Sequence, residues 1–405
     1  MRILIVSQYF YPESFRVNDM ALGLKERGHE VVVLTAKPNY PKGEFYNGYG
    51  YFSPSIEMWN GIKIYRSAII PRGKGGGLRL LINYFSFPFF ASLKSLFIKE
   101  KFDLVFVYQL SPVMIAIPGI VFKRRNKIPL YHYIQDLWPE SITAAGGIKN
   151  KYILKVMGAI TRFIYRNSDK ILVQSKGFIP FVLNQKAKKE QLIYYPNSAE
   201  NFYKVSPKED KYVSMLPKGF NLLFAGNIGE AQGFDTLLAA AVILKKRNIK
   251  VNWVILGDGR MKQYVEQKVE ELGLNDSFYL LGAFPVTEMP MFFSCADALL
   301  VSLKKDFIFA LTIPSKIQSY LACGKPIIGS LDGEGSRIIV ESNAGYTSEA
   351  EDELGLADSV QKLVELNDSE RIQLGINARK YFEKEFEREH LLDRFEGIIN
   401  GKILE

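Results

Sequence analysis

Cysteine and histidine are scarce in this chain of 405 residues, which contains only two cysteines and three histidines. Both cysteines, Cys295 and Cys323, lie inside apolar runs, so the sequence predicts no disulfide framework, as is typical of a reducing compartment. The sequence contains no His/Cys cluster with metal-ligand spacing, no Asp-x-Asp pair and no Walker A loop. The turn after the first predicted strand, Ser7–Pro12, lacks the glycine fingerprint of a nicotinamide-dependent dehydrogenase. We therefore expect neither a bound metal nor a cofactor.

Long apolar runs are also lacking. The run Ile3–Val6 is too short for a signal peptide and predicts a first strand. Leu80–Leu93 is shorter than the roughly 20 residues of a membrane-spanning helix. Leu104–Phe122 is long enough but is interrupted by Pro112 and Pro118, so a strand, a loop and a helix explain it better. The sequence predicts no transmembrane helix.

The pattern of apolar residues predicts an α/β protein. Runs rich in Val, Ile and Leu alternate with helical patterns along the whole chain, as expected for parallel sheets with both faces covered. We predict two Rossmann-like domains, 1–196 and 197–380, which face each other across a cleft. We expect a final helix, 381–405, to return to the first domain. Ligands of such sheets bind beyond the carboxyl ends of the strands.

Charge is distributed unevenly between the two halves. Residues 1–200 contain 28 Lys/Arg and 13 Asp/Glu, a net of +15, and the remaining residues contain 24 and 30, a net of −6. A basic half indicates a polyanionic partner. Residues 72–101 place Phe and Leu between Lys/Arg residues, which is typical of a segment at an anionic membrane surface and not of nucleic-acid binding. A core helix with solvated ends is the alternative.

Two glycine-rich turns follow strands in the second half. Gly226, Asn227, Gly229 and Gln232 lie between a predicted strand and the helix that begins at Phe234. Glycines at such a turn let the backbone approach an anion at a helix N-terminus, although a tight turn also needs glycine.

The second of these turns is Leu256–Gly259, which contains Gly257, Asp258 and Gly259. The two glycines leave room above the end of the strand. Asp258 is suited to accept hydrogen bonds from hydroxyls, or it caps a helix that starts at Arg260.

A third motif in this half, Thr312–Gly324, predicts a helix that begins at Pro314 and Ser315 and ends at Gly324. Lys316 then falls in the first turn, where a cation opposes the helix dipole unless an anion binds there. A surface lysine is the other interpretation.

In the first half, polar residues follow two strands. His132, Asp136 and Glu140 lie within nine residues after a predicted strand and are candidates for chemistry, although a lone histidine is more often structural. After the first strand, Glu13, Arg16 and Asn18 are suited to bind sugar hydroxyls; a plain polar loop is the alternative.

Taken in order, five motifs resemble glycosyltransferase family 4, a family of retaining enzymes with the GT-B fold, over nearly the whole chain. They are Tyr11-Pro12-Glu13 with Arg27–Val31, Pro196-Asn197, Ala225–Gly229, Leu256–Gly259 and Ala322–Pro326. The segments Asp136–Glu140 and Pro314–Lys316 resemble the WbuB-like L-fucosamine transferases of bacterial surface polysaccharide synthesis.

Two departures from the family pattern stand out. Asn227 and Gln232 occupy the places where the family presents Arg and Lys to a diphosphate, and the family's paired glutamates would fall at Leu311 and Ser319. The resemblance therefore implies that Lys316 and loop amides bind the diphosphate. It also implies that Gln318 or Ser319 meets the ribose and that the base lies near Phe284. Thr312 and Ser315 complete the expected donor site.

The resemblance implies a retaining, metal-independent transfer of an N-acetylamino-deoxyhexose, with N-acetyl-L-fucosamine as the candidate, from a UDP-sugar to a polyprenyl-diphosphate-linked saccharide. Capsule or O-antigen synthesis on the cytoplasmic face of the plasma membrane is the expected setting. Catalysis would involve His132, Asp136 and Glu140, and acceptor binding Glu13, Arg16 and Asn18. Two alternatives stay open: a UDP-sugar 2-epimerase of the same fold, and a non-catalytic scaffold of a polysaccharide assembly complex.

Overall fold

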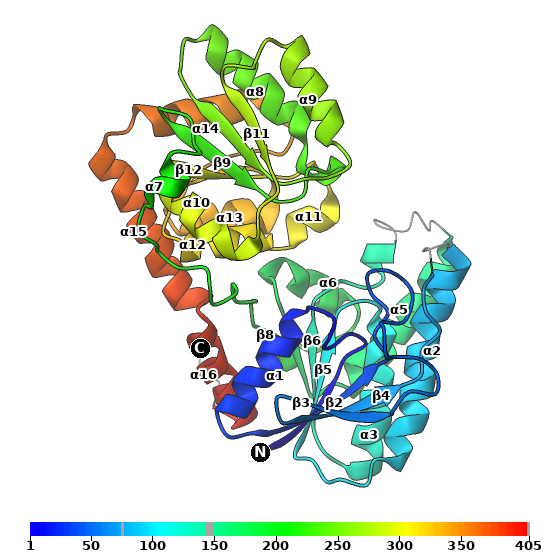
Figure 1. Ribbon diagram of the computed structural model, residues 1–405. Helices are drawn as coiled ribbons and strands as arrows, with labels where there is room; N and C mark the ends of the chain where they lie inside the picture. Colours follow the sequence, from blue (N-terminus) through cyan, green and yellow to red (C-terminus); the bar gives the residue numbers. More distant parts are fainter. Residues whose placement is uncertain (74–76, 143–149, 403–405) are drawn as a thin grey trace. The chain divides into compact units, whose positions relative to one another are not determined.

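The computed structural model describes residues 1–73, 77–142 and 150–402, and the chain divides into two compact units, Met1–Tyr195 and Pro196–Glu405 (Figure 1). The division falls one residue before the predicted boundary between residues 196 and 197, in a linker segment that runs from Tyr195 to Tyr203. The return of the last helix to the first domain stays a prediction.

The first unit is built on an eight-stranded sheet. Its order is β3-β4-β2-β1-β5-β6-β7-β8, and all pairs are parallel except β3 with β4. The strands are β1 (Arg2–Val6), β2 (Glu30–Ala36), β3 (Ile56–Trp59), β4 (Ile62–Ser67), β5 (Leu104–Gln109), β6 (Leu130–Ile134), β7 (Lys170–Val173) and β8 (Leu192–Tyr194). The strand predicted at Ile3–Val6 is confirmed as β1, and the short strands β3 and β8 lie at the two edges of the sheet.

Helices connect these strands. They are α1 (Arg16–Glu26), α2 (Gly77–Phe97), η1 (Val113–Ile115), α3 (Ala116–Asn126), α5 (Lys151–Asn167), η2 (Lys176–Phe178), α6 (Ile179–Asn184) and η3 (Lys189–Gln191). Both α2 and α5 pack against α3. Asn150 caps α5 by accepting from the backbone N–H groups of Tyr152 and Ile153.

Helix α2 contains an apolar stretch that is longer than the charge-free run Leu80–Leu93. Arg79–Phe97 is 19 residues long with a mean hydropathy of 1.3, so by length and composition α2 could cross a membrane, contrary to the expectation from Leu80–Leu93. The difference arises because Lys94 does not end the apolar stretch. Its ammonium turns into the protein and donates to the carbonyls of Ser55 (3.1 Å) and Arg66 (2.8 Å). A third of the stretch is buried within the structure.

The second unit contains a six-stranded parallel sheet in the order β11-β10-β9-β12-β13-β14. The strands are β9 (Asn221–Ala225), β10 (Asn252–Leu256), β11 (Phe278–Gly282), β12 (Ala298–Ser302), β13 (Ile327–Ser330) and β14 (Gly345–Ser348). Successive residues of a strand enter opposite cores: Leu223 and Leu299 pack on one face, and Leu222 and Leu300 on the other. Both faces are therefore apolar, which explains the continuous Val/Ile/Leu runs.

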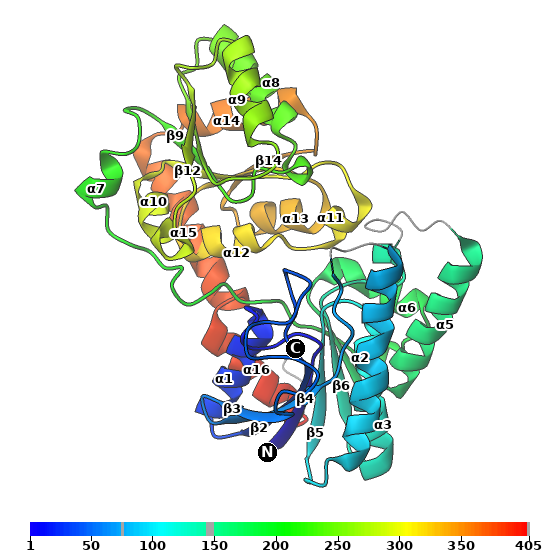
Figure 2. The ribbon, with the colours of Figure 1, turned by 45° about the vertical axis from the view of Figure 1, so that its right-hand side comes forward.

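Helices cover both faces of this sheet (Figure 2). One face carries α8 (Phe234–Lys246), α9 (Lys262–Glu271) and α14 (Glu353–Glu365). The other carries α10 (Met289–Cys295), α12 (Ser315–Ala322), α13 (Gly333–Glu341) and part of α15 (Asp368–Glu385). The remaining helices are α7 (Asp210–Val213), η4 (Glu230–Gln232), η5 (Val286–Glu288), α11 (Phe307–Leu311) and α16 (Arg388–Ile399).

Candidate functional site

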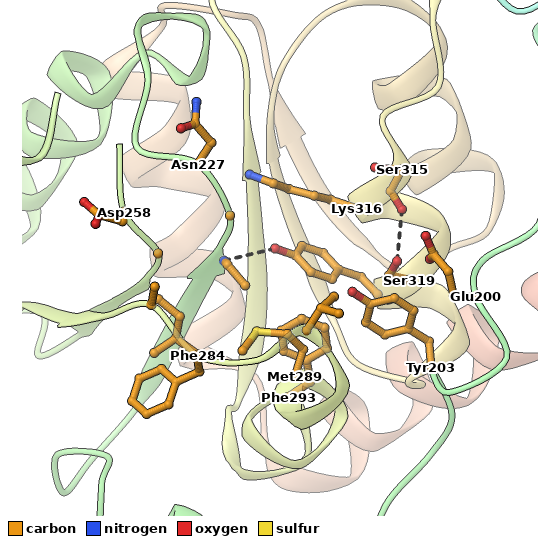
Figure 3. A pocket seen from close by; sticks show the side chains of 17 residues that line it. Glu200, Tyr203, Asn227, Asp258, Phe284, Met289, Phe293, Ser315, Lys316 and Ser319 are labelled. Atoms are coloured by element: carbon orange, nitrogen blue, oxygen red, sulfur yellow. Dashed lines mark hydrogen bonds between the residues drawn. The ribbon is translucent and has the colours of Figure 1, made fainter. Parts of the chain in front are cut away.

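A pocket of about 440 Å³ opens in the second unit beyond the carboxyl ends of β9 and β10 (Figure 3). Its wall combines two glycine turns, the first turn of α12, an aromatic cluster and the linker segment that begins the unit. The lining residues are Glu200, Tyr203, Ala225, Gly226, Asn227, Leu256, Gly257, Asp258, Ala283, Phe284, Val286, Met289, Phe293, Ser315, Lys316, Ser319 and Tyr320. This is the position at which open α/β sheets bind ligands.

The two glycine turns are joined to each other through their backbones. Gly226 N–H donates to the carbonyl of Leu256 (2.8 Å), and Ile228 N–H donates to that of Asp258 (2.8 Å). A Cβ at Gly257 would lie 1.8 Å from the carbonyl oxygen of Gly226, and its φ of +152° also favours glycine. The second turn therefore needs glycine for its backbone to approach the first turn this closely at the edge of the pocket.

Lys316 lies in the first turn of α12, as predicted, and reaches across the pocket toward the first glycine turn. Its Nζ is 3.6 Å from the centre of the Phe224 ring, and a Cβ at Gly226 would lie 2.8 Å from it. Within the described residues no carboxylate pairs with this ammonium. Burial lowers the pKa of Lys316 to about 7. An anion bound here would supply the missing counter-charge.

The opposite side of the pocket is apolar. Phe284 and Met289 line it, together with Phe293, which packs edge-on against Tyr320. The Tyr320 hydroxyl accepts from the N–H of Ala225 (3.3 Å) and donates to the carbonyl of Leu300 (3.3 Å), so it ties α12 to the sheet. This surface can accommodate a flat ring at one end of the pocket, away from Lys316.

Of the predicted donor-site residues, eight line the pocket: Gly226, Asn227, Gly257, Asp258, Phe284, Ser315, Lys316 and Ser319. Asp258 does not cap a helix at Arg260, because α9 begins at Lys262; its Oδ1 accepts from the N–H of Gly259 (2.8 Å).

Five predicted donor-site residues lie outside the lining. Gln318 is fully buried and its Nε2 donates to the carbonyl of Asn197 (2.6 Å), so it holds the linker and does not face the pocket. The Thr312 hydroxyl donates to the carbonyl of Ile308 (3.2 Å), within its own turn. Gln232 accepts from the N–H of Gly229 (3.2 Å), and a Cβ at Gly259 would lie 2.3 Å from the carbonyl oxygen of Ile228. The last four, Thr312, Gly229, Gln232 and Gly259, shape the loops around the pocket.

Sequence reasoning missed Glu200 and Tyr203, because a polar linker carries no periodic signal. Their position after Pro196-Asn197 was the only hint. In Figure 3 both side chains lie on the α12 side of the pocket, and the Glu200 carboxylate points toward Ser315 and Ser319.

His132 does not lie at a strand end. It is the third residue of β6, pairs in register with Val107 and Ile171, and is fully buried with its ring 6.0 Å from that of Tyr165. Its ring nitrogens make no hydrogen bond within the described residues. Burial lowers the pKa of His132 to about 3, so the ring is neutral. The expected role in orienting a hydroxyl does not fit this position.

Asp136 and Glu140 lie beyond the end of β6. The Asp136 carboxylate accepts from the indole N–H of Trp138 (3.1 Å) and from the hydroxyl of Ser141. Burial raises the pKa of Asp136, and these donors oppose the rise. Burial also raises the pKa of Glu140. Asp136 is thus held rigidly and is half-buried, which suits electrostatic stabilisation better than proton exchange with solvent.

The Glu13 carboxylate is hydrogen-bonded within the protein. It is buried, and its Oε1 accepts from the N–H groups of Asn39 (2.8 Å) and Tyr40 (2.7 Å). Asn18 donates to the carbonyl of Glu13 (2.7 Å). Contrary to the expectation that Glu13 and Asn18 bind sugar, both stabilise the loop after β1. Arg16 begins α1 and is partly buried.

No group of three or more His, Cys, Asp or Glu side chains that could hold a metal ion occurs in residues 1–73, 77–142 and 150–402.

Two family models match this chain. "Glycosyl transferase 4-like domain" matches residues 14–198, and "Glycosyl transferases group 1" matches residues 208–381. The first model covers most of the first unit and the second includes the pocket from Ala225 to Tyr320.

Curated relatives span the same architecture. "Putative colanic acid biosynthesis glycosyl transferase WcaI" of Escherichia coli K12 is 25% identical over 434 aligned residues, covering 99% of this chain and 100% of that protein. "Probable glycosyltransferase WbjE" of Pseudomonas aeruginosa is 26% identical over 279 residues, covering 67% of this chain and 68% of that one.

Solved structures share the fold at low identity. Sucrose-phosphate synthase from Thermosynechococcus elongatus has a TM-score of 0.72 and 17% identity, covering 99% of this chain and 98% of that chain. Anabaena Alr3699/HepE in complex with UDP has a TM-score of 0.69 and 14% identity, covering 99% and 100%.

Proposed function

Since this chain is a glycosyltransferase of the two-domain GT-B type, we propose that it transfers an N-acetylamino-deoxyhexose from a UDP-sugar to a polyprenyl-diphosphate-linked saccharide. N-acetyl-L-fucosamine is the candidate sugar. Capsule or O-antigen synthesis on the cytoplasmic face of a bacterial plasma membrane is the proposed setting. The name of the relative WcaI, which assigns it to colanic acid biosynthesis, supports a role in polysaccharide synthesis.

The observation that carries the proposal is the pocket of the second unit. At one end, the Lys316 ammonium lies beside a glycine turn and has no carboxylate partner among the described residues; the other end offers aromatic and apolar surface. A nucleoside diphosphate has the same polarity, with two phosphates at one end and a base at the other. The base would lie against Phe284, and the diphosphate between the turn at Gly226 and Lys316. The UDP complex of the Anabaena structure supports this class of ligand.

The proposed reaction retains the configuration of the sugar. The acceptor oxygen forms a bond to the anomeric carbon as the bond from that carbon to the diphosphate oxygen breaks, and the acceptor proton passes to the leaving phosphate. Lys316 and the backbone N–H of Asn227 would stabilise the negative charge that develops on the leaving group, without a metal. Asp136 would stabilise the cationic character of the sugar.

Two helices support the proposed contact with an anionic membrane. Exposed apolar side chains recur at helical spacing on α2, at Leu81, Phe85, Phe89 and Leu93, and Phe97 is 79% exposed. Helix α5 exposes Tyr152, Val156 and Phe163 between lysines and arginines. Apolar surface bounded by cations is what an interfacial segment needs. A lipid-linked acceptor would be reached from such a surface.

A thermal-shift screen against UDP, GDP and dTDP, each with and without EDTA, tests the donor site. UDP should raise the melting temperature equally in both conditions, because a ligand that binds only the folded state stabilises it. A chain that binds none of these nucleotides would favour the scaffold alternative. Exchange of the sugar proton in the donor without acceptor would favour the epimerase.

Co-sedimentation with vesicles of phosphatidylglycerol or phosphatidylcholine tests the membrane contact. The wild type should pellet with the anionic vesicles, and Phe89→Ser with Phe97→Ser should reduce that fraction several-fold. Leu354→Ser, at another exposed apolar position (57%) in the second unit, serves as the control. Equal pelleting of all three proteins would refute a membrane role for α2.

A further inference from the structure

The pocket contains a carboxylate whose role the proposed function leaves open. Glu200 lies in the linker segment at the start of the second unit and lines the pocket. Its side chain is exposed, and within the described residues no hydrogen bond or ion pair holds the carboxylate. In Figure 3 it points toward Ser315 and Ser319 on α12, on the opposite side of the pocket from Asp258. A free carboxylate beside a site for an anionic ligand repels that ligand unless it faces a hydrogen-bond donor on it.

The chemistry of the ligand supplies such donors. Between the base and the diphosphate, a ribonucleoside diphosphate carries two neighbouring hydroxyls, both able to donate to one carboxylate. In dinucleotide-binding α/β sheets, a carboxylate accepts hydrogen bonds from ribose hydroxyls for this reason. Glu200 and Lys316 both line the α12 side of the pocket, with Phe284 on the other side. A nucleotide with its base at Phe284 and its phosphates at Lys316 would present its ribose toward the linker.

Three other polar side chains in or near the pocket are hydrogen-bonded within the protein. Ser319 donates to the carbonyl of Ser315 (3.2 Å), and Gln318 donates to Asn197. Asp258 accepts from its own turn and lies beside the glycines. Glu200 is thus the pocket-lining carboxylate on the linker side whose oxygens are both available to a ligand.

We propose that Glu200 binds the ribose diol of the donor and makes the pocket selective for ribonucleotides over 2′-deoxyribonucleotides such as dTDP-sugars. This inference rests on the proposed function. It assigns to the linker the role that the sequence comparison expected of Gln318 or Ser319. The proposal also gives the Glu200 carboxylate hydrogen-bond donors in the complex, since the two ribose hydroxyls replace the water that a bound nucleotide displaces.

The test is calorimetric titration of the full chain with UDP and with 2′,3′-dideoxy-UDP. The wild type should bind UDP about 10-fold or more tightly than the dideoxy analogue, because hydrogen bonds to a charged group contribute more than neutral ones. Glu200→Ala should weaken UDP binding by a similar factor and leave the dideoxy analogue unaffected, so that the ratio approaches one. Glu209→Ala removes another exposed, unpaired glutamate from the same unit, outside the pocket, and should preserve the ratio.

The outcomes separate the two proposals. If the wild type binds UDP and Glu200→Ala keeps the full preference for UDP over the analogue, the role of Glu200 is refuted while the donor site stands. If the wild type binds neither nucleotide, both proposals fall. A lower melting temperature of Glu200→Ala without a change in the ratio would also count against ribose binding, since it would indicate a structural role for the linker.

Discussion

Replacing Lys316 with methionine should have opposite effects on the free protein and on its complex with UDP. Burial lowers the pKa of this ammonium from 10.5 to about 7. At roughly 1.4 kcal/mol per pH unit, the charged form destabilises the unliganded fold by a few kcal/mol, on the order of 3–5. Because the folded pKa lies below the unfolded one, this penalty is full below pH 7 and is relieved as pH rises toward 10.5. Lys316→Met should therefore raise the melting temperature at pH 6 and flatten its dependence on pH above 7.

The complex should respond in the other direction. A charge-assisted hydrogen bond contributes about 1.5–3 kcal/mol, so Lys316→Met should weaken UDP binding roughly 10- to 100-fold. At pH 8 the free lysine is largely neutral and must be protonated to meet the diphosphate. Binding to the wild type should then take up close to one proton, and affinity should fall as pH rises above 7. The variant should show neither effect.

Calorimetry in two buffers of different ionisation enthalpy measures the proton uptake, and thermal unfolding from pH 6 to 9 measures the stability. Lys246→Met, on the exposed last turn of α8, is the matched control and should behave like the wild type in both. Unchanged UDP affinity in Lys316→Met, or proton uptake that survives the substitution, would refute the assignment of Lys316 to the diphosphate.

Three further predictions follow from contacts in the structure. Gly257→Ala should lower the melting temperature more than Gly226→Ala. Both glycines have a positive φ (+152° and +144°) that disfavours alanine, but a Cβ at Gly257 would also lie 1.8 Å from the Gly226 carbonyl oxygen, whereas a Cβ at Gly226 would meet the flexible end of Lys316. Gly226→Ala should also weaken UDP binding, and equal melting temperatures for the two variants would contradict this reasoning. Burial raises the pKa of Glu13 to about 7, so the free energy of unfolding should fall as pH rises from 4.5 to 7. Glu13→Gln should flatten this fall, measured by urea titrations at each pH. An unchanged pH dependence would show that Glu13 is not the titrating group. Asp136→Asn should lower turnover roughly 10²- to 10⁴-fold with little change in UDP affinity, and near-normal turnover would remove Asp136 from the mechanism.

Much of the fold could be predicted because the strands are buried on both faces. Continuous apolar runs such as Ile3–Val6 identified their strands directly, and the alternation of runs with helical patterns implied two parallel sheets. The short edge strands β3 and β8 were missed because one is half exposed and the other is only three residues long. Edge strands have one partner and lack the continuous apolar signal.

The site was predictable where a residue's role follows from its place in an element. Lys316 was found because Pro314 and Ser315 fix the start of a helix, and Gly257 because a strand ends just before it. His132 was misplaced because it lies inside β6, between two paired strands and fully buried, and not beyond the end of the strand. The predictions for Glu13 and Gln318 were wrong for another reason. Whether a polar side chain binds a ligand or a backbone group of the protein depends on tertiary contacts that the sequence does not reveal.

We propose above all that a nucleoside diphosphate binds in the second unit, with its phosphates at Lys316 beside the first glycine turn. The decisive experiment is a crystal structure of the chain with UDP. We expect phosphate oxygens within hydrogen-bonding distance of Lys316 Nζ and the backbone N–H of Asn227, with the base against Phe284. A nucleotide bound anywhere else on the chain would contradict it.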